Sequence, residues 1–234
     1  MPHTTAMLFA LTSPHQSLSL NDFNTWYDNR HAPSRAACPG VHSVCRFRAE
    51  DDTSAEKAEA LRKGGSLSAR IEPWSWLAMY ELENEDALKT DQYKKAREED
   101  GDDESKMFDF LSRRVYKVLS DKRRDDYTQF ATSGKTRYMT VVSLQPDASS
   151  ELSTEEFHDC SRWELTDARD PRNWDVEQTG IARFLALHEW EEADVVFGSR
   201  ELKEAVSTEW RQTTIGRIDP STEERRLLKL WKQF

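Results

Sequence analysis

The stretch Trp76-Leu77-Ala78-Met79-Tyr80-Glu81-Leu82 returns later in the chain as Phe184-Leu185-Ala186-Leu187-His188-Glu189-Trp190. Two further pairs of segments repeat in the same order around it, residues 18–23 with 152–157 and residues 113–119 with 225–231. The offsets between copies are unequal, as expected of one unit that was duplicated and then altered in its loops. The sequence therefore predicts two copies of one folding unit.

The composition favours an ordered globular protein. Of 234 residues, 10% are aromatic, and the formal net charge is −10. Negative charge disfavours nucleic acid and anionic membranes as partners. No apolar run approaches the ~18 residues of a membrane span, and no signal peptide is visible. Three cysteines without a CxxC spacing are typical of reduced thiols, so we expect a cytoplasmic protein.

The first half predicts the order strand, helix, two strands, helix, strand. Ser19 and Asp22 resemble a capping box, so the first helix should span about residues 21–31, with Pro33 preventing its continuation. The predicted strands are residues 7–11, 41–48, 74–82 and 114–119. The second helical region is predicted at residues 87–97 and 107–111, interrupted by a solvated acidic run at 98–104. Residues 51–73 are expected to be a mobile surface excursion.

The second half repeats this order in a shorter form. Strands are predicted at residues 138–144, 181–190 and 226–231, and helices at 154–166 and 201–210. Because this half is shorter, its second strand should be shortened or merged with the third. We therefore expect a first domain at residues 1–124, a linker at 125–135 and a second domain at 136–234.

A β-α-β-β-α-β unit is the ferredoxin-like split motif. Its helices cover one face of a four-stranded sheet and leave the other face bare, which is stable only against another layer. The second copy can supply that layer. The predicted fold class is therefore α+β, with two ferredoxin-like repeats forming a pseudo-dimeric α+β barrel in one chain, as a monomer or homodimer.

The stretch Phe23-Asn24-Thr25-Trp26-Tyr27-Asp28-Asn29-Arg30-His31-Ala32-Pro33 carries a family pattern. It is followed by Pro39-Gly40-Val41 and by Arg46-Phe47. Together these residues resemble an EthD-like member of the dimeric α+β barrel superfamily, here as a fused tandem repeat. In that family an aromatic-rich first helix ends in W/Y-x-x-x-H-x-P, and a later strand carries an arginine and an aromatic residue. The stretch Trp76 to Leu82 also resembles the family's third strand.

The resemblance implies a class of chemistry. Relatives include cofactor-independent decarboxylases and cyclases of aromatic polyketide pathways, small monooxygenases, lactone isomerases and members without an assigned activity. We expect a cofactor-independent lyase (decarboxylase or dehydratase) or isomerase/cyclase acting on a hydrophobic, aromatic or polyketide-like metabolite in secondary metabolism. The alternatives are a cofactor-free monooxygenase and a non-catalytic small-molecule-binding or stress-response barrel. No nucleotide-binding loop is present, and His158 and Cys160 lack further metal ligands in range, so we expect no cofactor and no metal.

Phe23, Tyr27 and His31 form a stripe at i, i+4 and i+8 on one helix face. Core packing is the alternative role for Phe23 and Tyr27. A lone histidine on a helix is usually structural, but the resemblance implies that His31 is catalytic. Histidine side chains suit acid–base chemistry, because their ordinary pKa lies near neutrality. Asp28 could orient the His31 ring or be a solvated carboxylate.

Alternate strand residues point to opposite faces, so Tyr80 and Glu81 must diverge. If Trp76, Ala78 and Tyr80 face the pocket, Tyr80 offers its hydroxyl to a substrate oxygen, and His188 holds the equivalent place in the second half. Arg46 could bind an acidic substrate group or form an ion pair. The expected catalytic residues are His31, Tyr27, Asp28 and Tyr80, and the expected substrate-binding residues are Phe23, Trp26, Arg46, Trp76, His188 and Trp190.

The second copy loses the polar residues of the helix stripe. Trp26, Tyr27, Asp28 and His31 align with Cys160, Ser161, Arg162 and Leu165, and a leucine cannot transfer protons. We therefore expect one working site per chain, in the first half.

Overall fold

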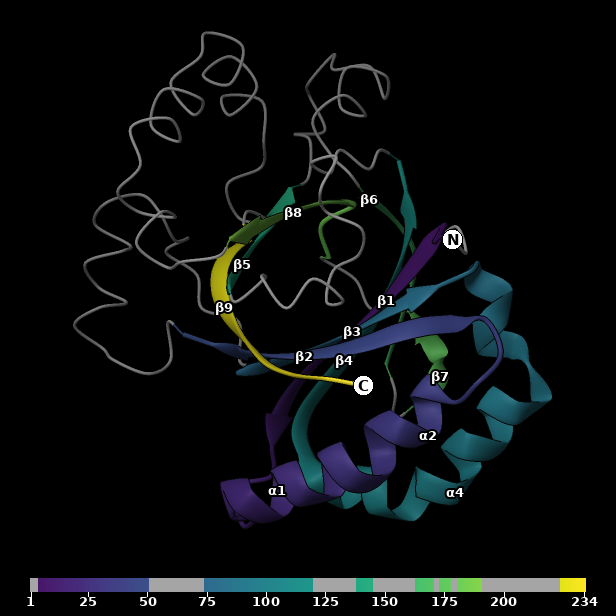
Figure 1. The fold of residues 1–234 in the computed structure, drawn as a ribbon, viewed down its shortest axis with the longest axis vertical. Helices are drawn as coiled ribbons and strands as arrows, with labels where there is room; N and C mark the ends of the chain where they lie inside the picture. The colour runs from purple at the N-terminus through teal and green to yellow at the C-terminus, as the bar shows by residue number, and fades with distance from the viewer. Residues whose placement is uncertain are drawn as a thin grey trace, which may run out of the picture.

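In the computed structural model of the chain, the described residues are 4–50, 74–119, 138–144, 163–170, 173–177, 181–190 and 224–234. Their strands form a single antiparallel sheet that curls into a ring (Figure 1). The strands are β1 (Ala6–Pro14), β2 (Val41–Ala49), β3 (Trp76–Leu82), β4 (Phe108–Val118), β5 (Tyr138–Leu144), β6 (Trp163–Asp170), β7 (Asn173–Glu177), β8 (Phe184–Trp190) and β9 (Glu224–Gln233).

The strand order is β4-β1-β3-β2-β9-β5-β8-β6-β7, and an additional pairing of β4 with β6 closes the ring. The first half contributes β4-β1-β3-β2, and the second half contributes β9-β5-β8-β6 in the corresponding order. β6 takes the place of β2 in the second half, and β9 takes the place of β4. The two contacts between the halves therefore correspond, because β2 pairs with β9 and β6 pairs with β4. The α+β barrel predicted from the sequence is confirmed.

The interior of the ring is one apolar core shared by both halves. Alternation along β1 sends Met7, Phe9 and Leu11 inward, while Leu8 and Ala10 point outward. The second half contributes Met139, Val141, Leu185, Leu187 and Leu228 to the same core. Neither half could bury these side chains alone, because each inner face is covered by the other.

Helices cover the outer face of the first half's sheet, on one side of the ring (Figure 1). They are α1 (Leu20–Trp26), the π-helical turn η1 (Tyr27–His31), α2 (Ala32–Ala36), the 3-10 turn η2 (Glu85–Lys89) and α4 (Asp91–Met107). One arm of the predicted capping box is confirmed, because the Ser19 hydroxyl accepts a hydrogen bond from the Asp22 backbone N–H at 3.0 Å. The Asp22 carboxylate accepts from the Ser19 hydroxyl at 2.7 Å. None of the helices in this part of the chain is long and apolar enough to cross a membrane.

The first helical segment does not end at His31, contrary to the prediction from Pro33. The backbone N–H of Ala32 donates to the carbonyl of Tyr27 five residues earlier, which defines a π turn. Ala32 keeps helical angles of φ −65° and ψ −43°, and Pro33 lies in the first turn of α2. A proline is tolerated there, because its missing N–H would have few partners in a first turn. The one-residue widening therefore carries the helix past the proline.

Three further predictions are wrong. The acidic run at 98–104 lies inside the continuous helix α4, and residues 108–111 belong to β4 instead of a helix. The second strand of the second half was predicted to be shortened or merged with the third, but it is the separate strand β6, of 8 residues against 9 in β2. Residues 163–166 of this strand were predicted to be helical. β6 pairs with both β4 and β8, and this tertiary pairing outweighs local helix propensity. The predicted excursion 51–73, linker 125–135, helix 201–210 and residues 154–162 lie outside the described residues.

Candidate active site

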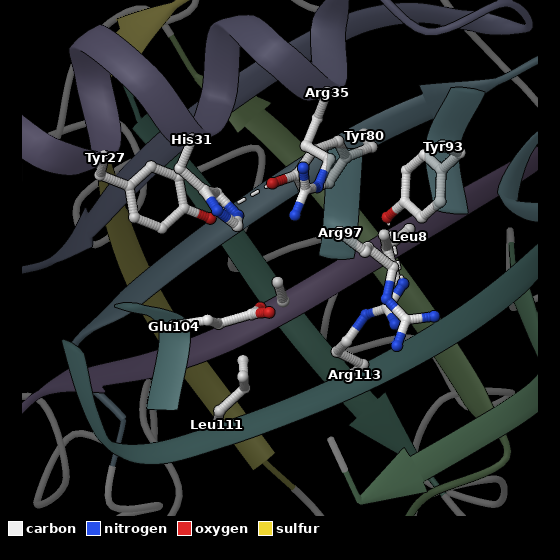
Figure 2. Close-up of a pocket in the computed structure, with 11 residues that line it drawn as sticks. Leu8, Tyr27, His31, Arg35, Tyr80, Tyr93, Arg97, Glu104, Leu111 and Arg113 are labelled. Atoms are coloured by element: carbon white, nitrogen blue, oxygen red, sulfur yellow. Dashed lines mark hydrogen bonds between the residues drawn. The ribbon is translucent and has the colours of Figure 1, made fainter. Parts of the chain in front are cut away.

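A cavity lies between the outer face of the first half's sheet and the helices that cover it (Figure 2). On the helical side, the described residues that line this cavity are Tyr27, His31, Arg35, Tyr93, Arg97 and Glu104. The strands β1, β3 and β4 contribute Leu8, Ala10, Tyr80, Leu111 and Arg113. The free space is about 20 Å³, enough for one molecule about the size of water.

His31 is 5% exposed and forms a dyad with Asp100 on α4. Its Nδ1 lies 3.0 Å from Asp100 Oδ2. The same carboxylate lies 3.2 Å from the Nη2 of Arg35 and 3.2 Å from the Nε of Arg30. An ionised carboxylate can only accept hydrogen bonds, so we assign the ring proton to Nδ1. The basic lone pair of the imidazole is then on Nε2.

The dyad holds a neutral imidazole next to an ionised carboxylate. Burial lowers the pKa of His31 below 6.5, and the nearby charge of Arg35 lowers it too. The hydrogen bond to Asp100 raises this pKa but does not outweigh burial. Burial alone would raise the pKa of Asp100. The hydrogen bond and charge of His31 and the charges of Arg35 and Arg30 outweigh burial and hold that pKa below its usual value. His31 is therefore positioned to accept a proton at neutral pH.

Two phenol groups face the same cavity. The hydroxyls of Tyr27 and Tyr80 lie 3.3 Å apart, and both side chains are buried. Burial raises the pKa of Tyr27 to about 12, despite the nearby charge of Arg46. Burial and the neighbouring Tyr27 and Tyr93 hold the pKa of Tyr80 well above 10. Both groups stay protonated near neutrality and can donate hydrogen bonds to an oxygen of a bound molecule. The structure thus brings His31, Tyr27 and Tyr80 together at one cavity.

Asp28 and Arg46 lie on a different side of the helix from the His31 cavity. Arg46 is 1% exposed, forms an ion pair with Asp28 and donates to Asn24 Oδ1 at 3.0 Å. Its guanidinium also stacks 4.0 Å from the Tyr27 ring centroid. Asp28 in addition accepts from the indole N–H of Trp231 at 3.1 Å. Asp28 was expected to orient His31, but Asp100 takes that place, and Arg46 is held in the interior away from the cavity lining.

The predicted aromatic wall residues divide between packing and the site. Phe23 is fully buried in the layer between sheet and helices. Trp76 packs between Arg46, 4.5 Å away, and Trp231, 5.3 Å away, and is not among the residues that line the cavity. Trp26 lies next to His31, with 4.7 Å between the centroids of the two rings. The two rings are tilted by 35° to each other.

The second half contributes less than expected to this cavity. His188 is exposed on β8 and does not line it. The side chain of Trp190 lies outside the described residues, as do Cys160, Ser161 and Arg162. Leu165 belongs to β6. It therefore cannot be the helical equivalent of His31, and the alignment behind that comparison is wrong at this position.

Sequence reasoning missed the residues that α4 supplies. Tyr93, Arg97, Asp100 and Glu104 are spaced by four, three and four residues, which places them on one helix face. That spacing was a usable signal, although the acidic run around Asp100 was interpreted as a solvated loop. Among the described residues, no group of three or more His, Cys, Asp or Glu side chains is arranged to hold a metal ion.

A second, larger cavity of about 180 Å³ lies next to the first. Arg97 and Arg113 line both cavities. The remaining described lining of this outer cavity consists of Glu85, Leu88 and Lys89 from η2, Val115 from β4 and Asp167 from β6. Through Asp167, the second half contributes to the lining of this outer cavity.

No protein-family model and no curated protein sequence matches the chain. Solved structures share its fold. A provisionally assigned monooxygenase from Fusobacterium nucleatum aligns over 100% of this chain and 95% of its own, with a TM-score of 0.53 and 9% identity. An anthrone oxidase-like protein aligns over 99% and 93%, with a TM-score of 0.56 and 11% identity.

A provisionally assigned monooxygenase from Lactobacillus acidophilus aligns over 99% of this chain and 96% of its own, with a TM-score of 0.50 and 7% identity. These similarities establish the dimeric α+β barrel type of fold. At such identities they concern the fold alone, and the EthD-like resemblance and the duplication in sequence stay predictions.

Proposed function

We propose that this chain is a cofactor-independent enzyme that removes a proton from a small, hydrophobic, aromatic substrate, and that oxygenation is the reaction that follows. The observation that carries the proposal is the buried His31–Asp100 dyad, which shares one cavity with the protonated hydroxyls of Tyr27 and Tyr80. One such site per chain, in the first half, is part of the proposal.

The first step is general base catalysis. Nε2 of neutral His31 accepts a proton from an acidic C–H or O–H group of the substrate. The negative charge of Asp100 stabilises the imidazolium that forms, and it also fixes the ring orientation. Tyr27 and Tyr80 donate hydrogen bonds to the substrate oxygen on which negative charge develops. All three side chains are buried, so these interactions are stronger than they would be in water.

Oxygenation needs no external reductant if the substrate supplies the electrons. The carbanion formed by deprotonation of a methylene group adds to dioxygen, and the resulting peroxide anion is protonated to a hydroperoxide. Loss of the second C–H proton and cleavage of the O–O bond then give a carbonyl group and water. In sum, one methylene group and one dioxygen molecule become one carbonyl group and one water molecule.

The assigned names of the fold neighbours support oxygenation over the other chemistries: two are provisionally monooxygenases and one is anthrone oxidase-like. A lyase or isomerase/cyclase would share the proton transfer but consume no oxygen. A binding barrel would show no turnover. These alternatives are therefore separable when oxygen uptake and product formation are measured together.

The test is dissolved-oxygen uptake with a series of one-ring aromatic ketones that carry an acidic methylene group, in the presence of a metal chelator. The expected result is one dioxygen consumed per substrate, with a loss of at least about 100-fold in His31→Gln, since a general base contributes 10²–10⁴-fold. Lys95→Gln is the matched control, because Lys95 is exposed on the same helix as Asp100. Product formation without oxygen uptake would assign a lyase or isomerase, and binding without product would assign a binding barrel.

A further inference from the structure

Glu104 carries the only carboxylate among the described residues that line the inner cavity. It lies on α4, four residues after Asp100, and is half-buried. Three guanidinium groups line the same cavity, but Arg35 is paired with Asp100, and Arg97 and Arg113 interact with other groups. Within the part of the chain that the structure describes, no hydrogen bond or ion pair engages the Glu104 carboxylate. A carboxylate that faces a cavity without a fixed partner is available to a bound molecule.

Glu104 and His31 face this cavity from two different elements. Figure 2 shows the Glu104 side chain directed into the cavity on the side of Leu111, whereas His31 reaches it from η1. Burial lowers the pKa of His31, and the negative charge of Glu104 raises it. At Tyr27, burial and the charge of Glu104 both raise the pKa. The carboxylate thus belongs to the same site as the imidazole and the phenol.

The proposed reaction removes two protons from one methylene carbon, one before and one after oxygen has added. The two C–H bonds of such a carbon point in different directions. A substrate whose oxygen is held by Tyr27 and Tyr80 presents only one of them to His31, because proton transfer needs a close and aligned approach. The second proton therefore calls for a base on another wall of the cavity, which is where Glu104 lies.

We propose that Glu104 is the second general base of the site and that it converts the bound hydroperoxide to the carbonyl product. Its carboxylate accepts the remaining C–H proton. The electron pair of that bond forms the second bond of the carbonyl group, the O–O bond breaks, and hydroxide leaves. The hydroxide then takes the proton from Glu104, which gives water and restores the carboxylate.

This step balances without a further reactant, because the carbon is oxidised and the peroxide oxygen is reduced. The inference rests on the proposed function and assigns its second proton transfer, which that function leaves without a base. His31 remains the base for the first proton.

The α-hydroperoxide of propiophenone, supplied to the full chain in the absence of oxygen, isolates this step from the first one. It carries one aromatic ring, and its conversion to the vicinal diketone and water is followed by absorbance. We expect the wild type to accelerate diketone formation over buffer. Glu104→Gln should lose at least about 100-fold of that rate, since a general base contributes 10²–10⁴-fold.

Three further variants sharpen the comparison. Glu104→Asp keeps a carboxylate and should lose less than Glu104→Gln. Glu99→Gln is the matched control, because Glu99 is an exposed glutamate of the same helix. His31→Gln, which loses the first proton transfer, should also lose less of the hydroperoxide conversion than Glu104→Gln. A melting curve for each variant establishes that it is folded, which we expect of Glu104→Gln because it breaks no ion pair.

No acceleration by the wild type, or a wild-type rate in folded Glu104→Gln, would overturn the role of Glu104. A loss in His31→Gln as large as in Glu104→Gln would overturn the division of the two protons between two bases. With propiophenone and oxygen, Glu104→Gln should release the hydroperoxide in place of the diketone. If the hydroperoxide is converted through Glu104 and ketones consume no oxygen, the second base stands and the oxygenation falls. If ketones consume oxygen and the diketone forms equally fast in Glu104→Gln, the oxygenation stands and the second base falls.

Discussion

Nδ1 of His31 and Oδ2 of Asp100 lie 3.0 Å apart, and both side chains are buried. Asp100→Asn would replace the accepting carboxylate by an amide, which can impose the wrong ring tautomer and cannot stabilise an imidazolium. We expect kcat to fall by about 10²-fold, the lower range for loss of acid–base function. Asp103→Asn is the control, because Asp103 pairs with Arg30 on the solvent side of the same helix. Equal losses in both variants would contradict a dyad role for Asp100.

The lowered pKa of His31 predicts a pH dependence of stability and of activity. Between the folded-state pKa and 6.5, the unfolded chain binds a proton that the folded chain does not. The free energy of unfolding should therefore fall as pH is lowered through this interval and stay level above it. Asp100 should lower the free energy of unfolding further below about pH 3.8, because its folded-state pKa is also lowered. Urea unfolding between pH 4.5 and 8 measures how the free energy of unfolding depends on pH in the wild type and in His31→Gln. The two pH dependences should be equal if His31 is not buried and neutral.

Activity should respond to the same group. A base that works only as the neutral imidazole gives a rate that declines as pH falls below the lowered pKa of His31. The acid limb of kcat/KM should accordingly lie below pH 6.5. An acid limb above pH 7 would contradict this assignment.

Tyr80→Phe removes one of the two hydroxyls that face the substrate. We expect kcat to fall by about 10²-fold, as for one oxyanion donor, with KM changing little. Tyr116→Phe is the control, since Tyr116 lies in the barrel interior, away from the cavity. Spectroscopic titration should also find that Tyr27 stays protonated up to about pH 12. If both variants kept wild-type kcat, the hydroxyl of Tyr80 would have no part in the reaction.

Asp28→Asn should act on stability and not on chemistry. It leaves the guanidinium of Arg46 buried without its ion-pair partner, which costs about 3 kcal/mol of unfolding free energy. Turnover per folded molecule should be close to that of the wild type. Asp91→Asn, a change at an exposed carboxylate, is the control for stability. A folded Asp28→Asn variant without activity would instead restore the expectation that Asp28 serves His31.

The first half expressed alone, residues 1–124, should not be a stable monomer. Its inner sheet face includes Met7, Phe9, Leu77 and Met79, which the second half covers in the intact chain. Exposed patches of this size drive association. Size-exclusion chromatography should find dimers, larger species or insoluble protein. A soluble monomer with a cooperative melt would contradict the shared core.

The strands were predictable from the sequence, whereas several helix boundaries were not. In β1 and β3, short continuous apolar runs predicted strands that are covered on both faces, and the structure buries both faces of each strand. The acidic residues of α4 conceal a helix because its buried face carries Asp100 in place of an apolar residue. Residues 163–166 form a strand only because β4 and β8 are there to pair with, which local sequence does not reveal.

The site could be predicted only in part, because local sequence does not reveal which elements pack together. His31, Tyr27 and Tyr80 could be linked by helix and strand periodicity and by the family resemblance, and the structure places all three on one cavity. The partner of His31 comes from 69 residues further along the chain. Proximity of that kind is set by how α4 packs on the sheet, so a near neighbour in sequence, Asp28, was the natural but mistaken choice.

The π turn at Tyr27–His31 has an evolutionary consequence. It contains one residue more than a regular helical turn, and each residue of an α-helix rotates the chain by about 100°. Loss of a single codon there would restore regular helix and turn the imidazole away from α4, while Phe23 and the residues before it kept their packing. One insertion or deletion at this turn would therefore make or break the dyad, and it would also rotate the buried Ala32 and Arg35 that follow.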